Sequence, residues 1–256
     1  MRDDRFTVGS IAVLAFICAD IGHEVIGHAL GFVLAGGHTG TLTTTRLIET
    51  QRLGDRGGDI FDLGGPFGNL LFAAIAWLAL KILRPTLPMK LFLTLLMGCS
   101  LFWAFAYLMF CGVFGHGDWF ALIRAVPNQR VWRIVFCAGG FVLYRISLRL
   151  VAANLVWLNP PNRAFRVFLV SYLAGGAIAT AGAIFDPRGM YGLLHDAVLS
   201  GFGSTVGILT IPRYLRKPAE GSAPLLLLLS PIWIVAATAL SVFYIFVLGP
   251  GIKVTL

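Results

Sequence analysis

The sequence is poor in charge. Asp, Glu, Lys and Arg make up 12% of its 256 residues, whereas 57% are hydrophobic. A soluble domain carries about 25% charged residues, so the composition excludes an ordinary soluble protein and predicts a membrane protein with several spans. The net charge of +8 comes without a basic helix or an aromatic RNA-binding motif. Membrane lipids are therefore expected partners of the basic residues, and nucleic acid is not.

Cysteine and histidine are also scarce. The four cysteines lie in apolar runs without C-x-x-C spacing, which argues against a disulfide framework. The five histidines include no adjacent pair. His23 and His28 match one H-x-x-x-x-H box, but a histidine-box membrane oxygenase needs several such boxes, so that class is disfavoured.

A membrane-spanning helix needs about 20 apolar residues. Six segments meet this requirement: 8–34, 63–83, 89–114, 131–158, 164–185 and 224–248. A seventh segment, 191–215, is only moderately apolar and contains His195 and Asp196, so a span, a re-entrant piece and an interfacial helix all fit it. We therefore expect one all-α polytopic membrane domain over residues 1–256, with about six transmembrane helices. The first run is too long for a signal peptide, and a short chain without a targeting peptide suits a bacterial inner membrane.

The longest polar segment, residues 36–62, lies between the first two spans. Its stretch 41–50 is β-branched and alternating, which predicts a short β-hairpin. The following Asp55-Arg56-Gly57-Gly58-Asp59 predicts a turn.

The first span contains a polar cluster where apolar residues are expected. Asp20, His23, Glu24 and His28 lie inside it, and ionisable residues within a membrane segment indicate a functional site. Two histidines flanking a glutamate are also the side chains of a zinc hydrolase site.

The spacing of this cluster is unusual. The common zinc motif is H-E-x-x-H, but here the histidines are five residues apart, which places them about 140° apart around an ideal α-helix. On such a helix Glu24 and His28 would pair instead. Both histidines can reach one metal only if the helix absorbs a residue, as a π-bulge does. Gly22 and Gly27 flank the motif and would tolerate that distortion.

Two further motifs carry polar groups. Gly65-Pro66-Phe67-Gly68-Asn69 opens the second span, and Gly115-His116-Gly117-Asp118-Trp119 follows the third. Taken alone, the first fits a helix N-terminus with proline near the first turn. The second, taken alone, fits a helix cap or a solvated loop acid.

In combination, these motifs resemble the site-2 protease family of intramembrane zinc metallopeptidases. That family has a His/Glu helix, a G-x-x-x-N segment and a glycine-flanked Asp in three successive spans. The local sequence is similar too, with His28-Ala29-Leu30 followed by Ala35-Gly36-Gly37. The resemblance covers roughly residues 15–120. It implies a metalloprotease-like core at residues 8–120, followed by additional helices of unassigned role at 121–256.

The resemblance implies a zinc site with named ligands. His23 and His28 would be two zinc ligands and Asp118 the third, with His116 as the alternative third ligand. Glu24 would be the catalytic general base for the attacking water.

Other polar residues would support this site. The resemblance implies that Asn69, with Gly65, helps to hold the substrate peptide. Asp20 lies one turn before Glu24, where it could orient a ligating imidazole or form part of a proton path.

The leading hypothesis is thus an intramembrane zinc metalloprotease-like protein that hydrolyses peptide bonds of membrane-associated protein substrates. The alternative is a non-enzymatic membrane protein on the same scaffold, such as a metal carrier or an assembly factor.

Overall fold

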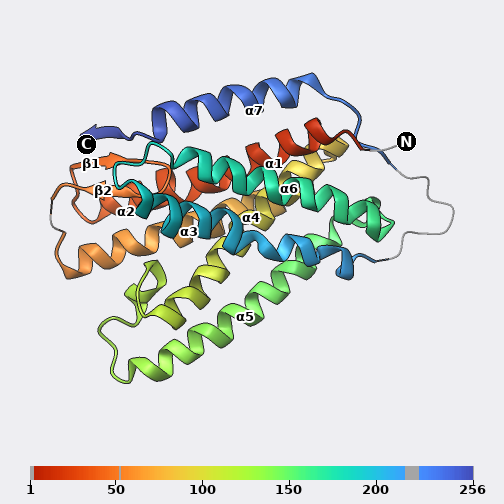
Figure 1. Ribbon diagram of the computed structural model, residues 1–256. Coiled ribbons are helices and arrows are strands. Elements are labelled where there is room, and N and C mark those ends of the chain that lie inside the picture. The colour runs from red at the N-terminus through yellow and green to blue at the C-terminus, as the bar shows by residue number, and fades with distance from the viewer. Residues whose placement is uncertain (1–2, 52, 217–224, 256) are drawn as a thin grey trace.

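The computed structural model describes residues 3–51, 53–216 and 225–255 and is a bundle of long helices (Figure 1). Within these residues, seven helical segments are long and apolar enough to cross a membrane, which supports a multi-pass membrane protein. They are Arg5–Leu34, Asp55–Ile82, Leu87–Phe114, Gln129–Ala153, Pro161–Gly182, Gly192–Tyr214 and Pro231–Leu248. The count is one more than predicted, because the moderately apolar segment near residues 191–215 is also helical over a spanning length.

The first span is a continuous helix with an irregular middle. It consists of α1 (Arg5–Asp20), the π-helix η1 (Ile21–His28) and α2 (Ala29–Leu34). The Asp4 carboxylate caps its start by accepting a hydrogen bond from the backbone N–H of Thr7 at 2.7 Å. This helix and α4 (Leu87–Phe114) are the two most buried spans. The polar cluster is therefore held in the interior of the bundle.

Glycines bring η1 and α3 (Asp55–Ile82) into backbone contact. A Cβ added to Gly27 would lie 2.9 Å from the carbonyl carbon of Gly64, and one added to Gly68 would lie 3.1 Å from that of Gly22. Any side chain at these positions would force the two helices apart. The glycines beside the polar cluster thus permit close packing, which presses α3 against the histidines.

Two predictions about α3 were wrong. The segment Asp55–Asp59 begins the helix rather than forming a turn, because Gly54 before it is extended and ends the loop. An acidic residue in the first turn, here Asp55, also favours a helix start. Pro66 consequently lies well inside α3 instead of near its first turn.

The predicted hairpin is confirmed and belongs to a larger sheet. Strands β1 (Thr39–Leu42) and β2 (Leu47–Glu49) are antiparallel, with Thr41 opposite Ile48. A third strand, β3 (Ile252–Thr255), pairs antiparallel with the other edge of β1, so the order is β2-β1-β3. The sheet lies at the end of the bundle opposite the N-terminus (Figure 1).

The chain reverses after α4. Gly115 ends that helix in the left-handed conformation (φ 72°), and Gly117 has a φ of 105°, which glycine adopts easily. A short 3-10 helix, η2 (Asp118–Leu122), follows. The indole N–H of Trp119 donates to the carbonyl of Ala104 at 2.8 Å and ties this turn back to α4. The reversal directs Asp118 toward η1.

The second half of the chain surrounds these elements. It contains α5 (Gln129–Ala153), η3 (Val156–Leu158), α6 (Pro161–Gly182), α7 (Pro231–Phe243) and η7 (Tyr244–Leu248). The helix between α6 and α7 is irregular and consists of η4 (Gly192–Ala197), η5 (Leu199–Gly203) and η6 (Ser204–Tyr214). Helix α5 packs along α4, and α6 packs along α1.

Candidate metal centre

The π-helix brings the two histidines of the polar cluster together. The amide of Ala29 donates to the carbonyl of Glu24, five residues back, so this turn holds one residue more than an α-helical turn. The imidazoles of His23 and His28 consequently lie with their centroids 4.9 Å apart, at an interplanar angle of 82°. The distorted turn was predicted from the spacing, and the structure has it where the spacing requires it.

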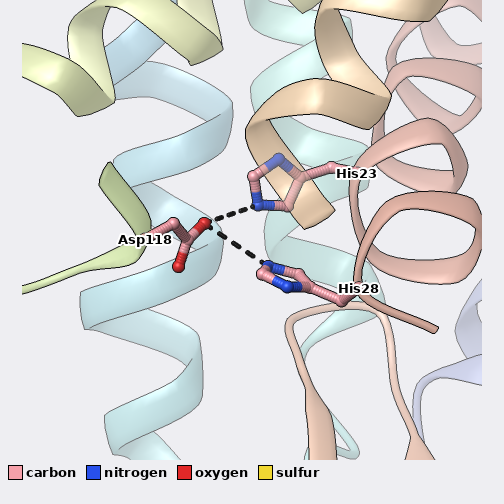
Figure 2. Close-up of side chains that lie close together, drawn as sticks. All are labelled: His23, His28 and Asp118. Atoms are coloured by element: carbon pink, nitrogen blue, oxygen red, sulfur yellow. Dashed lines mark ion pairs between the residues drawn. The ribbon is translucent and has the colours of Figure 1, made fainter. Parts of the chain in front are cut away.

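Asp118 completes the cluster from a distant part of the sequence. Its Oδ2 lies 3.2 Å from Nε2 of His23 and 3.4 Å from Nε2 of His28. Figure 2 shows the three side chains pointing toward one another, the histidines from η1 and Asp118 from the turn after α4. One ligand atom from each residue lies within 4.8 Å of the other two.

The cluster is buried, and its carboxylate is ionised. His23 and His28 are 2% and 5% exposed. Burial raises the pKa of Asp118, but the attraction of His28 and of His23, both within 3.4 Å, outweighs it and holds the pKa well below its usual range. Metal ligation requires a deprotonated carboxylate, which Asp118 therefore offers at neutral pH.

The residues around the cluster fit a metal ion. A Cβ added to Gly65 of α3 would lie 2.6 Å from Nε2 of His23 and closer still to Nε2 of His28. Only glycine at this position therefore lets the backbone of α3 lie directly against the two rings without displacing their Nε2 atoms. Two histidines and one aspartate also match the ligand types of zinc and leave a fourth position free.

Three groups support the rings of the candidate ligands. Nδ1 of His28 donates to the carbonyl of Phe61 at 2.8 Å. Nδ1 of His23 lies 2.9 Å from the side-chain amide of Asn69, which is fully buried. The indole of Trp103 stacks on His23, with centroids 4.6 Å apart and an interplanar angle of 15°. Such supporting contacts fix the orientation of metal ligands.

Glu24 lies beside the ligands without being one of them. It is 4% exposed, and its Oε1 is 3.9 Å from Nε2 of His23. Its Oε2 is buried and has no hydrogen-bond partner among the residues that the structure describes. An unpaired buried carboxylate oxygen is costly, so this one is available to a molecule bound at the site.

The other two polar residues predicted to support the site, His116 and Asp20, do not contact the two Nδ1 atoms or join the ligand cluster. His116 is exposed and packs edge-on against Phe110, with centroids 5.2 Å apart, so it is not among the grouped ligands. Asp20 is 1% exposed, but Asn69 and the Phe61 carbonyl take the two Nδ1 positions that it was expected to support.

Gly65 and Asn69, which were predicted to bind substrate, lie directly against the histidines. Their contact with a substrate stays a prediction.

The site opens into a cavity of about 970 Å³ that the second half of the chain helps to line. His23, Glu24 and His28 lie on one wall, and His195, Asp196 and Ser200 come from the helix between α6 and α7. Sequence reasoning did not connect this helix with the site. Other lining residues include Thr45, Arg46, Trp103, Tyr107, Phe110, Phe120 and Arg124.

A polar network joins two walls of the cavity. The Arg188 guanidinium forms an ion pair with Asp196 at 2.6 Å and donates a hydrogen bond to the hydroxyl of Thr45 at 2.7 Å. The same hydroxyl in turn donates to the carboxylate of Asp186. Burial raises the pKa of Asp186, but its hydrogen bonds with Arg188 and Thr45 outweigh that effect and lower it. The network fixes the hairpin loop to the helix that begins at Gly192.

Neither protein-family models nor curated proteins nor solved structures gave a match to this chain. The function of this chain is therefore inferred from the geometry of the site.

Proposed function

We propose that this protein is a membrane-embedded zinc metalloprotease of the site-2 protease type. The observation that carries the proposal is the convergence of His23, His28 and Asp118, whose candidate ligand atoms lie within 4.8 Å of one another. The unpaired oxygen of Glu24 beside these residues supports hydrolysis over simple metal storage.

Zinc bound there would supply Lewis-acid chemistry, polarising a carbonyl and lowering the pKa of a coordinated water toward about 7. Glu24 would take the proton of the attacking water at Oε2. As the carbon–oxygen bond forms and the peptide carbon–nitrogen bond breaks, Glu24 would pass this proton to the leaving nitrogen. General acid–base catalysis of this kind contributes about 10²–10⁴-fold.

The cavity favours a peptide as the substrate. One side offers the aromatic rings of Trp103, Tyr107 and Phe110, and another offers Arg46 and Asp196. Apolar side chains and the polar backbone of an extended peptide could both be accommodated in such a space. A protein segment within or next to the membrane is the substrate class that we propose.

The test compares membranes from cells that produce the unchanged protein or the Glu24→Gln variant. New protein N-termini are identified by mass spectrometry, with and without the chelator 1,10-phenanthroline. We expect N-termini that need both the metal and Glu24, with a reduction of at least about 100-fold in Glu24→Gln. Glu49→Gln is the matched control, because Glu49 is exposed on β2, and it should cut as the unchanged protein does.

Two outcomes would contradict the proposal. A zinc-loaded protein that generates no new N-termini would favour the non-enzymatic alternative. Bound iron in place of zinc would favour oxygen chemistry, since two histidines and a carboxylate also suit Fe(II).

A further inference from the structure

The inference concerns Asn69 and rests on the metal site of the proposed function. A neutral imidazole carries one hydrogen, so the partner of one ring nitrogen decides whether the other can bind a metal. In His28 the assignment is clear. Nδ1 faces the carbonyl of Phe61, which can only accept, so Nδ1 carries the hydrogen. In the neutral ring, which is the form that binds a metal, the lone pair is then on Nε2.

His23 needs the same arrangement but has a different partner. Its Nε2 also faces Asp118, at 3.2 Å. Its Nδ1, however, lies 2.9 Å from Nδ2 of Asn69, and an amide NH₂ group can only donate. In that orientation Nδ1 would accept, the hydrogen would be on Nε2, and Nε2 could not bind a metal. The two neighbouring histidines would then have opposite tautomers.

We propose that Asn69 is a positioning residue that presents its amide oxygen to His23 and thereby selects the tautomer that binds metal. The oxygen and nitrogen of a side-chain amide have nearly the same size and are exchanged by a half-turn of the amide. Oδ1 of Asn69 is buried and has no partner among the described residues. The half-turn moves Oδ1 to Nδ1 of His23 and moves the NH₂ group to the place that Oδ1 leaves. His23 selects this orientation of the Asn69 amide. Only when an acceptor faces Nδ1 does the ring carry its hydrogen there and leave the lone pair of Nε2 available to a metal.

The position of Asn69 on α3 explains why it can do this. It lies one helical turn after Gly65, and residues four apart share a face of a helix. The same face therefore places the backbone of Gly65 against the two Nε2 atoms and the side chain of Asn69 beside Nδ1 of His23. Asn69 is 0% exposed, so it is shielded from the cavity in which a substrate would bind. Its role is to orient a ligand rather than to contact the substrate.

Two variants of similar size separate an acceptor from a group that can neither accept nor donate. Asn69→Asp, when ionised, can only accept, and Asn69→Leu can do neither. We expect Asn69→Asp to keep the zinc affinity of the unchanged protein within about threefold, whereas Asn69→Leu weakens it by about 10–100-fold, the usual cost of losing a ligand's supporting partner. Affinity is measured on detergent-purified protein by competition with a chromophoric zinc chelator. The absorption spectrum of the Co²⁺-loaded protein reports whether the ligand set is intact.

Thr94→Val is the matched control. Thr94 is buried in α4, and its hydroxyl donates to the carbonyl of Lys90 within the same helix. This variant also removes a buried polar group but should leave zinc affinity unchanged. Equal zinc affinity in Asn69→Leu and the unchanged protein would overturn the inference. So would an Asn69→Asp variant that folds but binds as weakly as Asn69→Leu, because a donor would then be what His23 needs.

A measurement on the unchanged protein covers the case in which the buried charge introduced by Asn69→Asp prevents folding of that variant. NMR of ¹⁵N-histidine in the zinc-loaded protein should show a hydrogen on Nδ1 of His23 that exchanges slowly with water. A hydrogen on Nδ1 of His23 that exchanges rapidly with water would overturn the inference, because Nδ1 would then have no buried acceptor. If the unchanged protein binds no zinc at all, the proposed function fails as well, whereas the results above reject the role of Asn69 alone.

Discussion

The imidazoles of His23 and His28 lie 4.9 Å apart, centroid to centroid, although the two residues are five positions apart in the sequence. An α-helix would direct them about 140° apart. The π-helix Ile21–His28 removes that divergence by placing one more residue in the turn. π-Bulges are frequent at functional sites, and here the bulge has a definite effect, which is to align two side chains on one point.

If the additional residue between His23 and His28 only widens the π-helical turn, zinc binding should tolerate its removal. Ile26 is 39% exposed and is not part of the ligand cluster. Its deletion changes the motif to H-E-x-x-H, which an undistorted α-helix can present to one metal. We expect this variant to keep its zinc affinity within about tenfold, as measured by chelator competition. Insertion of an alanine after Ile26 should abolish binding, and equal loss in both variants would refute this view of the π-helix.

Gly65 should be as necessary for metal binding as the ligand residues themselves are. In Gly65→Ala the new methyl group would lie within 2.6 Å of both Nε2 atoms and would displace the two rings. We expect loss of stoichiometric zinc, measured by elemental analysis. Gly175→Ala is the matched control, because a Cβ there would meet its nearest neighbour at an ordinary 3.8 Å. Full zinc occupancy in Gly65→Ala would mean that the metal lies elsewhere or is not bound by these rings.

The polar network around Asp186 should make stability depend on pH. Its pKa is lower in the folded protein than the unfolded value of about 4. The carboxylate therefore stabilises the fold at pH values above about 4, and this contribution disappears as the pH falls through the folded pKa. Because Arg188 retains Asp196 as a partner, we expect Asp186→Asn to cost about 1 kcal/mol at pH 7, or about 2–4 °C in apparent melting temperature.

The check is a series of thermal unfolding curves in detergent from about pH 7 to about pH 3, a range that spans the carboxylate titration. The gap between the unchanged protein and Asp186→Asn should be largest at neutral pH and should close toward the acidic end. A gap that stays constant over this range would indicate a packing effect instead of a lost charge.

Much of the site was predictable because polar residues are conspicuous in an apolar sequence. His23, Glu24 and His28 attract attention inside the first span, and their spacing predicts a distorted helix. Asp118 was predicted as a ligand only through the resemblance to the site-2 protease family, in which a glycine-flanked Asp follows the third span. In the structure, Gly115 and Gly117 have positive φ values and form the turn that directs Asp118 inward.

The supporting contacts could not be predicted in the same way. The partner of His28 is the backbone carbonyl of Phe61, and every residue has such a carbonyl. Trp103 is an aromatic residue in an apolar helix and looks like any core residue until it is found stacked on His23. Gly65 acts through the side chain that it lacks.

The predicted fold failed where long-range contacts decide the outcome. Strand β3 exists because the chain returns from α7 to the free edge of β1, and a four-residue strand has little signal of its own. The start of α3 at Asp55 was missed because its first turns are polar and glycine-containing, which typically indicates a loop.

The most direct test is the metal content of the detergent-purified protein beside His28→Ala, Asp118→Ala and His38→Ala. His38 is exposed in the loop before β1 and serves as the control. The account predicts one zinc ion per chain in the unchanged protein and in His38→Ala, and less than about a tenth of that in the other two variants. Absence of stoichiometric metal from the unchanged protein, or full occupancy without Asp118, would contradict the claim that these residues from separate parts of the chain form one metal site.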